Sequence, residues 1–285
     1  MTEGLDRTIA PSVVVRARDK IDTIEATIDS LRGQSVACEI VLVDSGSTDG
    51  TLERAGPRCD RVVQLAPARF SYGHALNLGA GAANGQIVFA LSAHCAPRRA
   101  DWIERSLAHY RDPSVAGTCG ERLDPSGAPL AAPCLADLAM ALANPYWGYS
   151  CHACSWRRDV WRAFPFDEDM ASCEDKDWSW RVLAAGRTVA VDPALVVDGG
   201  HRRAAGIRTL ATRVYRESAA VSEHLEYPTW SLAELGRHWW GDFAYPSRYP
   251  DGMRRLGPMR TVELGARWAG EQSGRRRRGP HTVRP

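Results

Sequence analysis

Residues 40–51, Ile-Val-Leu-Val-Asp-Ser-Gly-Ser-Thr-Asp-Gly-Thr, join a buried strand to a helix through a short polar turn. The apolar run ends at Asp44, and Thr51 restarts a helical pattern. In an open α/β sheet, ligands bind beyond the carboxyl ends of the parallel strands. Asp44 in this place predicts a contact to a nucleobase or ribose, although Asp, Ser and Thr also cap turns that bind nothing.

Strand and helix patterns alternate through the first half of the chain. Strands are predicted at residues 11–17, 39–43, 61–65 and 87–91, and helices at 21–31, 73–84 and 101–110. Such alternation is typical of an α/β fold with a mostly parallel central sheet flanked by helices. After about residue 120 the alternation stops, and the predicted elements are a helix at 172–185, a strand at 188–191 and a helical segment at 204–238 broken near Pro228. The stretch that follows is rich in Trp and Pro and is predicted to be irregular.

Composition limits the class of protein. A chain of 285 residues with 44% hydrophobic content can bury a substantial core. It contains no run of the roughly 18–20 apolar residues that a membrane helix needs, and its N-terminus does not resemble a secretory signal. The eight cysteines are therefore expected to be reduced thiols in a cytoplasmic protein.

The charge is unevenly distributed. The net charge is +2, yet residues 274–285 hold five arginines and no acid, so the rest of the chain is slightly acidic. This distribution argues against a nucleic-acid-binding domain. The basic end is predicted to be a disordered tail.

Two histidines are candidate metal ligands. His94 follows the strand at 87–91 and would enter the same crevice as Asp44. Imidazole suits Mn or Zn better than the harder Mg, but a histidine at a strand end is also often structural. His201 follows two glycines, whose backbone permits close approach to a ligand, and would supply a second metal ligand or contact a phosphate.

The segment Ser172-Cys-Glu-Asp-Lys-Asp-Trp178 permits two interpretations. Ser172 and Asp175 have the spacing of a capping box, and Glu174 and Asp175 would favour a helix N-terminus through its dipole. Alternatively, a carboxylate at a helix start in a cleft can act as a general base toward a hydroxyl nucleophile.

A cysteine pair and an aromatic cluster have structural explanations. Cys151 and Cys154 lack the second pair that structural zinc commonly requires, so they are expected to be small buried residues. The aromatic residues of 145–161 are expected in the core, with Trp147 or Trp156 as an alternative stacking surface for a sugar.

Six segments, in this order and spacing, resemble the family 2 glycosyltransferases, and specifically their rhamnosyltransferase-like branch. The resemblance covers roughly residues 10–203. The segments are Val13-Val-Val-Arg-Ala-Arg-Asp-Lys, Ile40-Val-Leu-Val-Asp-Ser-Gly-Ser-Thr-Asp-Gly-Thr, Phe70-Ser-Tyr-Gly-His-Ala-Leu-Asn-Leu-Gly-Ala, Ile87-Val-Phe-Ala-Leu-Ser-Ala-His, Phe166-Asp-Glu with Glu174-Asp-Lys-Asp-Trp, and Arg181-Val-Leu-Ala-Ala-Gly.

The resemblance implies a GT-A fold and an inverting hexosyltransferase that uses a nucleotide-diphosphate sugar. It implies a domain at 8–203, divided into a nucleotide-sugar half at 8–120 and an acceptor half at 121–203, then a helical extension at 204–272 and the tail at 273–285. By position, Asp175 would be the catalytic base and Glu174 its supporting partner. The implied nucleotide contacts are Arg16, Ala17, Asp44, Asn77, Gly85, Ser92 and Ala93, and the implied acceptor contacts are Trp147, Gly148 and Trp178.

One position departs from the family pattern. The family places an Asp-x-Asp-type motif where this chain has Ser92-Ala93-His94. In one account, His94 would hold a divalent ion, Mn or Mg, together with His201. In the other, no metal takes part, and imidazolium or nearby arginines would neutralise the charge of the departing diphosphate. Loss of activity is a third account, against which the intact Glu174-Asp175 pair argues.

The sequence also permits other functions. A sugar nucleotidyltransferase would want a Gly-rich loop after the first strand, whereas the chain has Arg16-Ala-Arg-Asp-Lys. A non-catalytic nucleotide-sugar- or glycan-binding relative would be indifferent to Asp175→Asn. The arginine-rich tail, with Arg208, Arg213, Arg216 and Arg237, predicts peripheral contact with the inner face of a membrane. Such a contact would suit a lipid-linked acceptor of polysaccharide biosynthesis.

Overall fold

The computed structural model describes residues 11–199, 206–229, 231–244 and 257–284. The chain forms two compact units. Unit 1 comprises Met1–Met170 and Glu174–His201, and unit 2 comprises Ala171–Cys173 and Arg202–Pro285.

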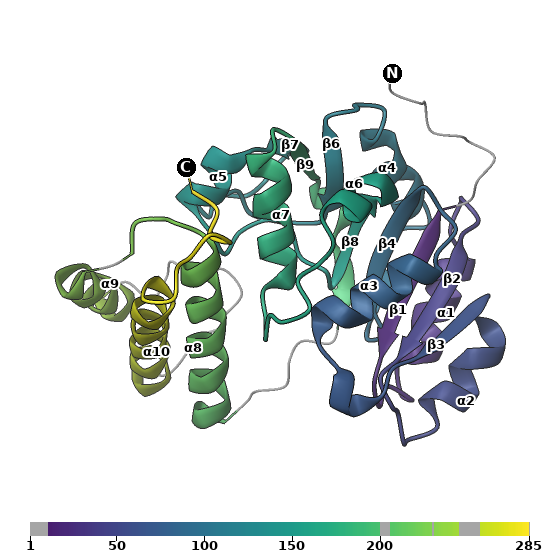
Figure 1. Cartoon of the computed structure of the whole chain (residues 1–285), viewed down its shortest axis with the longest axis horizontal. Coiled ribbons are helices and arrows are strands. Elements are labelled where there is room, and N and C mark those ends of the chain that lie inside the picture. The colour runs from purple at the N-terminus through teal and green to yellow at the C-terminus, as the bar shows by residue number, and fades with distance from the viewer. Residues whose placement is uncertain (1–10, 200–205, 230, 245–256, 285) are drawn as a thin grey trace. The chain divides into compact units, whose positions relative to one another are not determined.

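Unit 1 is built on one eight-stranded sheet (Figure 1). Its order is β3-β2-β1-β4-β8-β6-β9-β7, in which β3, β2, β1 and β4 are parallel neighbours and β8 runs antiparallel to both β4 and β6. The predicted α/β class with a mostly parallel central sheet is confirmed. The strands are β1 Ser12–Ala17, β2 Glu39–Asp44, β3 Arg61–Gln64, β4 Ile87–Ser92, β6 Val115–Cys119, β7 Cys134–Ala136, β8 Ala153–Arg157 and β9 Thr188–Val191. A separate ribbon pairs β5 Cys95–Pro97 with β10 Val197–Gly199.

Helices cover both faces of this sheet. They are α1 Ile24–Arg32, α2 Thr51–Ala55, α3 Tyr72–Ala82, α4 Trp102–His109, α5 Leu138–Ala143, α6 Arg158–Ala163 and α7 Glu174–Ala184. Single 3₁₀ turns occur at η1 Gly56–Arg58, η2 Pro67–Arg69 and η3 Pro193–Leu195. The short helices α5 and α6 were not predicted from the sequence.

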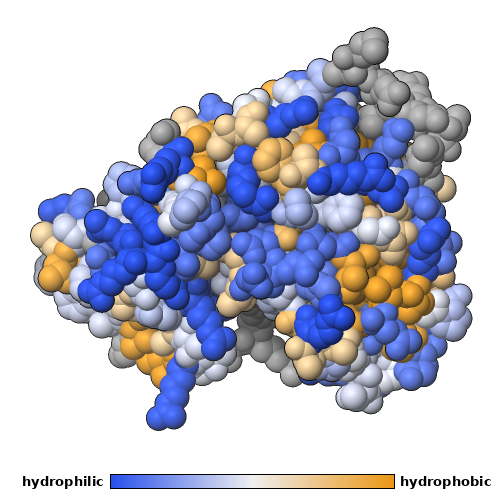
Figure 2. Space-filling view, in the orientation of Figure 1, coloured by the Kyte–Doolittle hydropathy of each residue, from blue (hydrophilic) through white to orange (hydrophobic). Residues whose placement is uncertain are grey.

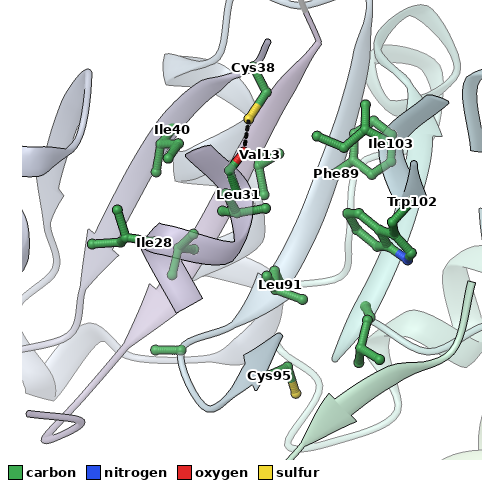
Figure 3. Packing of buried hydrophobic residues seen from close by; sticks show 14 of the residues in the cluster. Val13, Ile28, Leu31, Cys38, Ile40, Phe89, Leu91, Cys95, Trp102 and Ile103 are labelled. Atoms are coloured by element: carbon green, nitrogen blue, oxygen red, sulfur yellow. Dashed lines mark hydrogen bonds between the residues drawn. The ribbon is translucent and has the colours of Figure 1, made fainter. Parts of the chain in front are cut away.

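The main core lies between the sheet and helices α1 and α4 (Figure 3). Ile28 and Leu31 of α1 face it, and Phe89 of β4 packs on Trp102 of α4 with ring centroids 5.1 Å apart. The indole nitrogen of Trp102 donates to the carbonyl of Leu195 at 2.9 Å, which satisfies the one polar atom of that side chain in the core.

The opposite face of the sheet carries α3. Because side chains alternate along a strand, Val13, Val15 and Ala17 face the core of α1 and α4, and Val14 and Arg16 face α3. Gly79 of α3 lies so close that a Cβ there would be 2.3 Å from Cγ1 of Val14. Arg16 is therefore the last residue of β1 on the α3 face.

Unit 2 contains three helices, α8 Ile207–His224, α9 Leu232–Ala244 and α10 Gly257–Arg275. Helices α8 and α10 lie side by side (Figure 1). Their backbones approach closely at Gly270 and Gly274, where a Cβ would meet the carbonyls of Tyr215 and Ala219 at 2.4 and 2.2 Å. The prediction of an irregular stretch after residue 238 is thus wrong for α10. No helix in the described part of the chain is long and apolar enough to cross a membrane.

The basic C-terminal segment is not the disordered tail that its composition predicts. Val283 donates its N–H to the carbonyl of His224 at 2.8 Å, and Nε of Arg278 donates to the carbonyl of Ser222 at 2.8 Å. Arg277 forms an ion pair with Glu223 at 3.0 Å. The carbonyls and acids at the end of α8 thus hold this segment, and Figure 2 shows hydrophilic residues dominating this face of unit 2.

Candidate functional site

Strands β1, β2 and β4 end at the carboxyl edge of the parallel strands, and helix α7 begins there. In register, Arg16 of β1 lies opposite Val43 of β2 and Ser92 of β4, and Ala17 lies opposite Asp44. Strand β8 runs antiparallel and starts opposite Leu91, so the residues just before it reach the same edge. Ser92 accordingly donates its N–H to the carbonyl of His152 at 2.9 Å.

Asp175 is held at this edge at the start of α7. Its Oδ2 accepts the N–H of Cys151 at 3.0 Å, and its Oδ1 accepts the N–H of Lys176 at 2.8 Å. In the described residues the buried Oγ of Ser172 has no hydrogen-bond partner. The capping-box interpretation is therefore wrong, and the carboxylate of Asp175 is oriented by the loop before β8.

Glu174 is buried beside Asp175, with 5% of its surface exposed. Its Oε1 lies 4.0 Å from Nη1 of Arg16. Burial, and next the charge of Asp175, raise the pKa of Glu174 to about 8, and Arg16 only partly opposes them. Glu174 therefore holds a proton near neutral pH, and the site avoids two adjacent negative charges.

Arg16 brings a largely buried cationic group to the site. Its Nη2 donates to the carbonyl of Cys151 at 2.5 Å, and its guanidinium carbon lies 5.8 Å from the ring centre of Tyr72. Its Nε and Nη1 are buried without a hydrogen-bond partner among the described residues. Buried guanidinium N–H groups normally have partners, so this geometry suits an anion that supplies them.

Asp44 has its acceptors occupied by the turn that follows it. Its Oδ2 accepts the N–H groups of Gly46 and Ser47 at 3.0 Å each, and its Oδ1 accepts the Ser47 hydroxyl at 2.5 Å. It is 2% exposed and shares a sheet face with Ala17 rather than with Arg16. The turn-capping function is present, and the contact to a base or ribose stays a prediction.

Asn77 and Gly85 are not brought to this edge. The side-chain amide of Asn77 donates to the carbonyl of Phe166 and accepts from its N–H. Gly85 donates its N–H to Oγ of Ser12 at 2.8 Å, which is at the amino end of β1. Gly85 therefore borders the edge of the sheet opposite to Arg16, and a bound nucleotide at the carboxyl edge would not reach it.

The three predicted acceptor residues separate into two environments. Trp178 is fully buried and stacks on Tyr149 with ring centroids 4.8 Å apart, so it belongs to the core. Trp147 is 9% exposed, and its carbonyl accepts from Nζ of Lys176 at 3.0 Å. Gly148 has φ +82°, and a Cβ there would meet no atom within 4 Å. Trp147 and Gly148 thus lie beside the start of α7.

The residues described at the end of β4 do not assemble a metal site by themselves. Ala93 is buried, and His94 is half-buried next to it. His201 lies outside the described residues. Over the described ranges, the group of at least three His, Cys, Asp or Glu side chains close enough to share an ion is in unit 2 and excludes His94.

Three residues that contribute to the site were not predicted from the sequence. Cys151 acts through its peptide N–H and carbonyl, which no side-chain pattern reveals. His152 also contributes a carbonyl, while burial lowers the pKa of its imidazole. Tyr72 contributes the ring beside the Arg16 guanidinium. It lies in one of the family-like segments, and the sequence signal that could have indicated it was its position next to the start of a predicted helix.

The sequence of the chain is similar to that of a glycosyltransferase. The chain is 29% identical over 210 residues to the pre-mycofactocin glycosyltransferase of Mycobacterium tuberculosis, an alignment that covers 67% of this chain and 43% of that protein. The chain thus spans less than half the length of this relative.

Solved structures show the same fold at low sequence identity. The mannosyltransferase PcManGT from Pyrobaculum calidifontis, in complex with GDP-Man and Mn²⁺, is 18% identical with a TM-score of 0.58, over 95% of this chain and 75% of that one. Glucosyl-3-phosphoglycerate synthase from Mycobacterium tuberculosis is 20% identical with a TM-score of 0.53, over 73% and 80%. Residues 12–132, less than half of the chain, match the family model described as glycosyl transferase family 2, and the chain has the GT-A type of fold seen in these solved structures.

Proposed function

We propose that this protein is an inverting glycosyltransferase that moves a sugar from a nucleotide-diphosphate donor to an acceptor hydroxyl. The observation that carries the proposal is that Asp175 and Arg16 both bond the backbone of Cys151, at the edge where α/β folds bind ligands. The family 2 domain and the nucleotide-sugar complexes of its structural neighbours support it.

In this proposal Asp175 is the general base. It takes the proton of the acceptor hydroxyl while that oxygen forms a bond to the anomeric carbon and the bond to the donor phosphate breaks. The N–H of Cys151 fixes one carboxylate oxygen at 3.0 Å, which orients the base before the acceptor binds. Glu174, protonated near neutral pH, supports Asp175 without adding a second charge.

Arg16 stabilises the departing diphosphate. Its Nε and Nη1 would donate to phosphate oxygens, while Nη2 stays bound to the carbonyl of Cys151. A preorganised guanidinium directed at developing negative charge is a strong source of transition-state stabilisation. A metal-bound donor, with His94 as ligand, is the alternative, and the described residues supply no complete ligand set for it.

The remaining contacts follow the strand ends. Ala17, Asp44, Ser92 and Ala93 lie where the nucleoside would bind, and Trp147 with Gly148 would border the acceptor. A hexosyl donor, and rhamnosyl in particular, is the donor class that the sequence segments favour.

The test compares Asp175→Asn with Asp169→Asn, a matched change at an exposed carboxylate. Transfer should fall about 10²–10⁴-fold in Asp175→Asn and stay unchanged in the control. Calorimetry with uridine, thymidine and guanosine diphosphates, with and without Mn, should give the same nucleotide affinity for both variants. Intact transfer by Asp175→Asn would refute the assignment of the base. Nucleotide binding by a wild-type protein that transfers no sugar would favour the non-catalytic alternative.

We also propose peripheral contact with the inner membrane face through α9. This helix exposes 67% of Leu232 and 62% of Trp240, and the Arg237 side chain is 71% exposed. Arg277 pairs with Glu223 of α8 and Arg278 with Glu226 just after it, so we assign the membrane contact to α9 in place of the tail. Sedimentation with anionic vesicles should be weaker for the double variant Leu232→Ser, Trp240→Ser, and equal sedimentation would refute the proposal.

A further inference from the structure

Three potential metal ligands meet in unit 2 at the end of α8. Glu223 and His224 are its last two residues, and His281 comes from the C-terminal segment. One ligand atom from each lies within 4.8 Å of the others. The two imidazole rings have centroids 4.8 Å apart and an interplanar angle of 49°.

The two oxygens of Glu223 have different surroundings. Its Oε2 is 3.0 Å from Nε of Arg277, an ordinary ion-pair distance. Its Oε1 is 3.9 Å from Nε2 of His281, which is too long for a hydrogen bond. Zinc binds nitrogen and carboxylate oxygen at about 2 Å with tetrahedral geometry, so two of its ligands lie roughly 3.3 Å apart. The 3.9 Å between Oε1 and Nε2 is longer than that, and a small rotation of the exposed His281 side chain would bring both atoms to a shared ion.

Backbone contacts hold His281 against α8 independently of any ion. Thr282 donates its hydroxyl to the carbonyl of Glu223 at 2.7 Å, and Val283 pairs with both neighbours of Leu225, donating to the carbonyl of His224 at 2.8 Å and accepting from Glu226 at 2.9 Å. Thr282 and Val283 are buried. The ligands are thus largely preorganised, which lowers the conformational cost of binding.

We propose that Glu223, His224 and His281 bind a divalent transition ion of the zinc class. Two imidazoles and one carboxylate are a ligand set that zinc uses in proteins, with a remaining position for water. The ion would fasten the C-terminal segment to α8. This site belongs to unit 2 and does not depend on the proposed glycosyl transfer.

The experiment uses tag-free full-length protein, stripped with a chelator and titrated with zinc against a chromophoric competitor. Glu223→Gln keeps the shape of the side chain and removes the anionic ligand. Glu226→Gln is the matched control, because Glu226 lies three residues on and is outside the cluster. The wild type and the control should bind one zinc each, and Glu223→Gln should bind at least about tenfold more weakly, since even loss of a ligand's hydrogen-bonding partner costs that much.

Two further measurements decide the outcome. Zinc should raise the unfolding midpoint of the wild type and the control, but not of His281→Ala. Circular dichroism establishes that each variant is folded. Equal zinc binding by wild type and Glu223→Gln would assign the ion to other groups, such as cysteines, and would overturn the proposal. Absence of zinc binding by the wild type would overturn it as well.

Discussion

Replacing Asn77 by alanine separates a structural role from a nucleotide contact. Nδ2 of Asn77 donates to the carbonyl of Phe166 at 2.8 Å and to Oε1 of Glu168 at 2.9 Å. Its Oδ1 accepts from Nε1 of Trp161 at 2.9 Å and from the N–H of Phe166 at 3.1 Å. The amide therefore fastens the segment before α7 to helix α3.

The expected loss follows from these four bonds. The bond to the exposed Glu168 is easily replaced by water, and three part-buried bonds remain. A net contribution of about 0.5–1.5 kcal/mol for each gives a loss of about 1.5–4.5 kcal/mol in the free energy of unfolding. For a domain of this size, that loss lowers the midpoint of thermal unfolding by roughly 3–18 °C.

Chemical and thermal unfolding of Asn77→Ala, followed by tryptophan fluorescence, measures this loss. Asn84→Ala is the control, because its side chain donates one exposed bond, to Glu39 at 2.8 Å, and should cost less than about 1 kcal/mol. The affinity for nucleoside diphosphates should be unchanged in both variants. A stability equal to that of the control, together with weakened nucleotide binding, would refute the structural role and restore the ribose contact.

Two further predictions concern the sheet and the start of α7. In the folded state the pKa of Glu174 is raised to about 8, from an ordinary value of 4.5, so the free energy of unfolding should fall as pH rises between these values. Urea midpoints measured across this window should fall more in the wild type than in Glu174→Gln. Parallel curves for the two proteins would contradict the burial argument. Gly79→Ala should lower the free energy of unfolding by about 1–3 kcal/mol, because the added Cβ would meet Val14. Gly81→Ala is the control: its Cβ would have no atom within 4 Å, so this change should be neutral or stabilising. Equal unfolding midpoints for the two variants would show that α3 moves to accommodate the methyl group.

The nucleotide half of the fold was predictable because its pattern is local. The apolar run at 40–43 and the polar turn after Asp44 specify a strand, its end and its edge of the sheet. Helix α1 ends at Arg32, one residue beyond the predicted range of 21–31. By contrast, α10 follows a stretch rich in Trp and Pro, and its packing depends on glycines that meet α8 from a distant part of the sequence.

The site was only partly predictable, because its geometry depends on contacts between distant segments. Glu174 and Asp175 were identified by their position in a quoted segment. The sequence did not reveal which groups surround these two carboxyls, because Arg16 and the loop before β8 come from distant parts of the chain. Gly85 was placed at the nucleotide by its position in the family pattern, yet its N–H bonds Ser12 at the far edge. Because Gly85 lies just before β4, the direction of the chain places it at the amino edge of the parallel strands, and the family pattern alone suggested the nucleotide contact.

The backbone of Cys151 bonds the proposed base through its N–H and the proposed phosphate contact through its carbonyl. Both bonds would survive replacement of the side chain by another small residue, so an alanine scan would pass over this position without detecting it. Its contribution would emerge only from altering the backbone itself, for example by Cys151→Pro, which removes the N–H, or by an ester in place of the amide. Relatives could therefore differ freely in residue type here while keeping the same alignment of acid and cation.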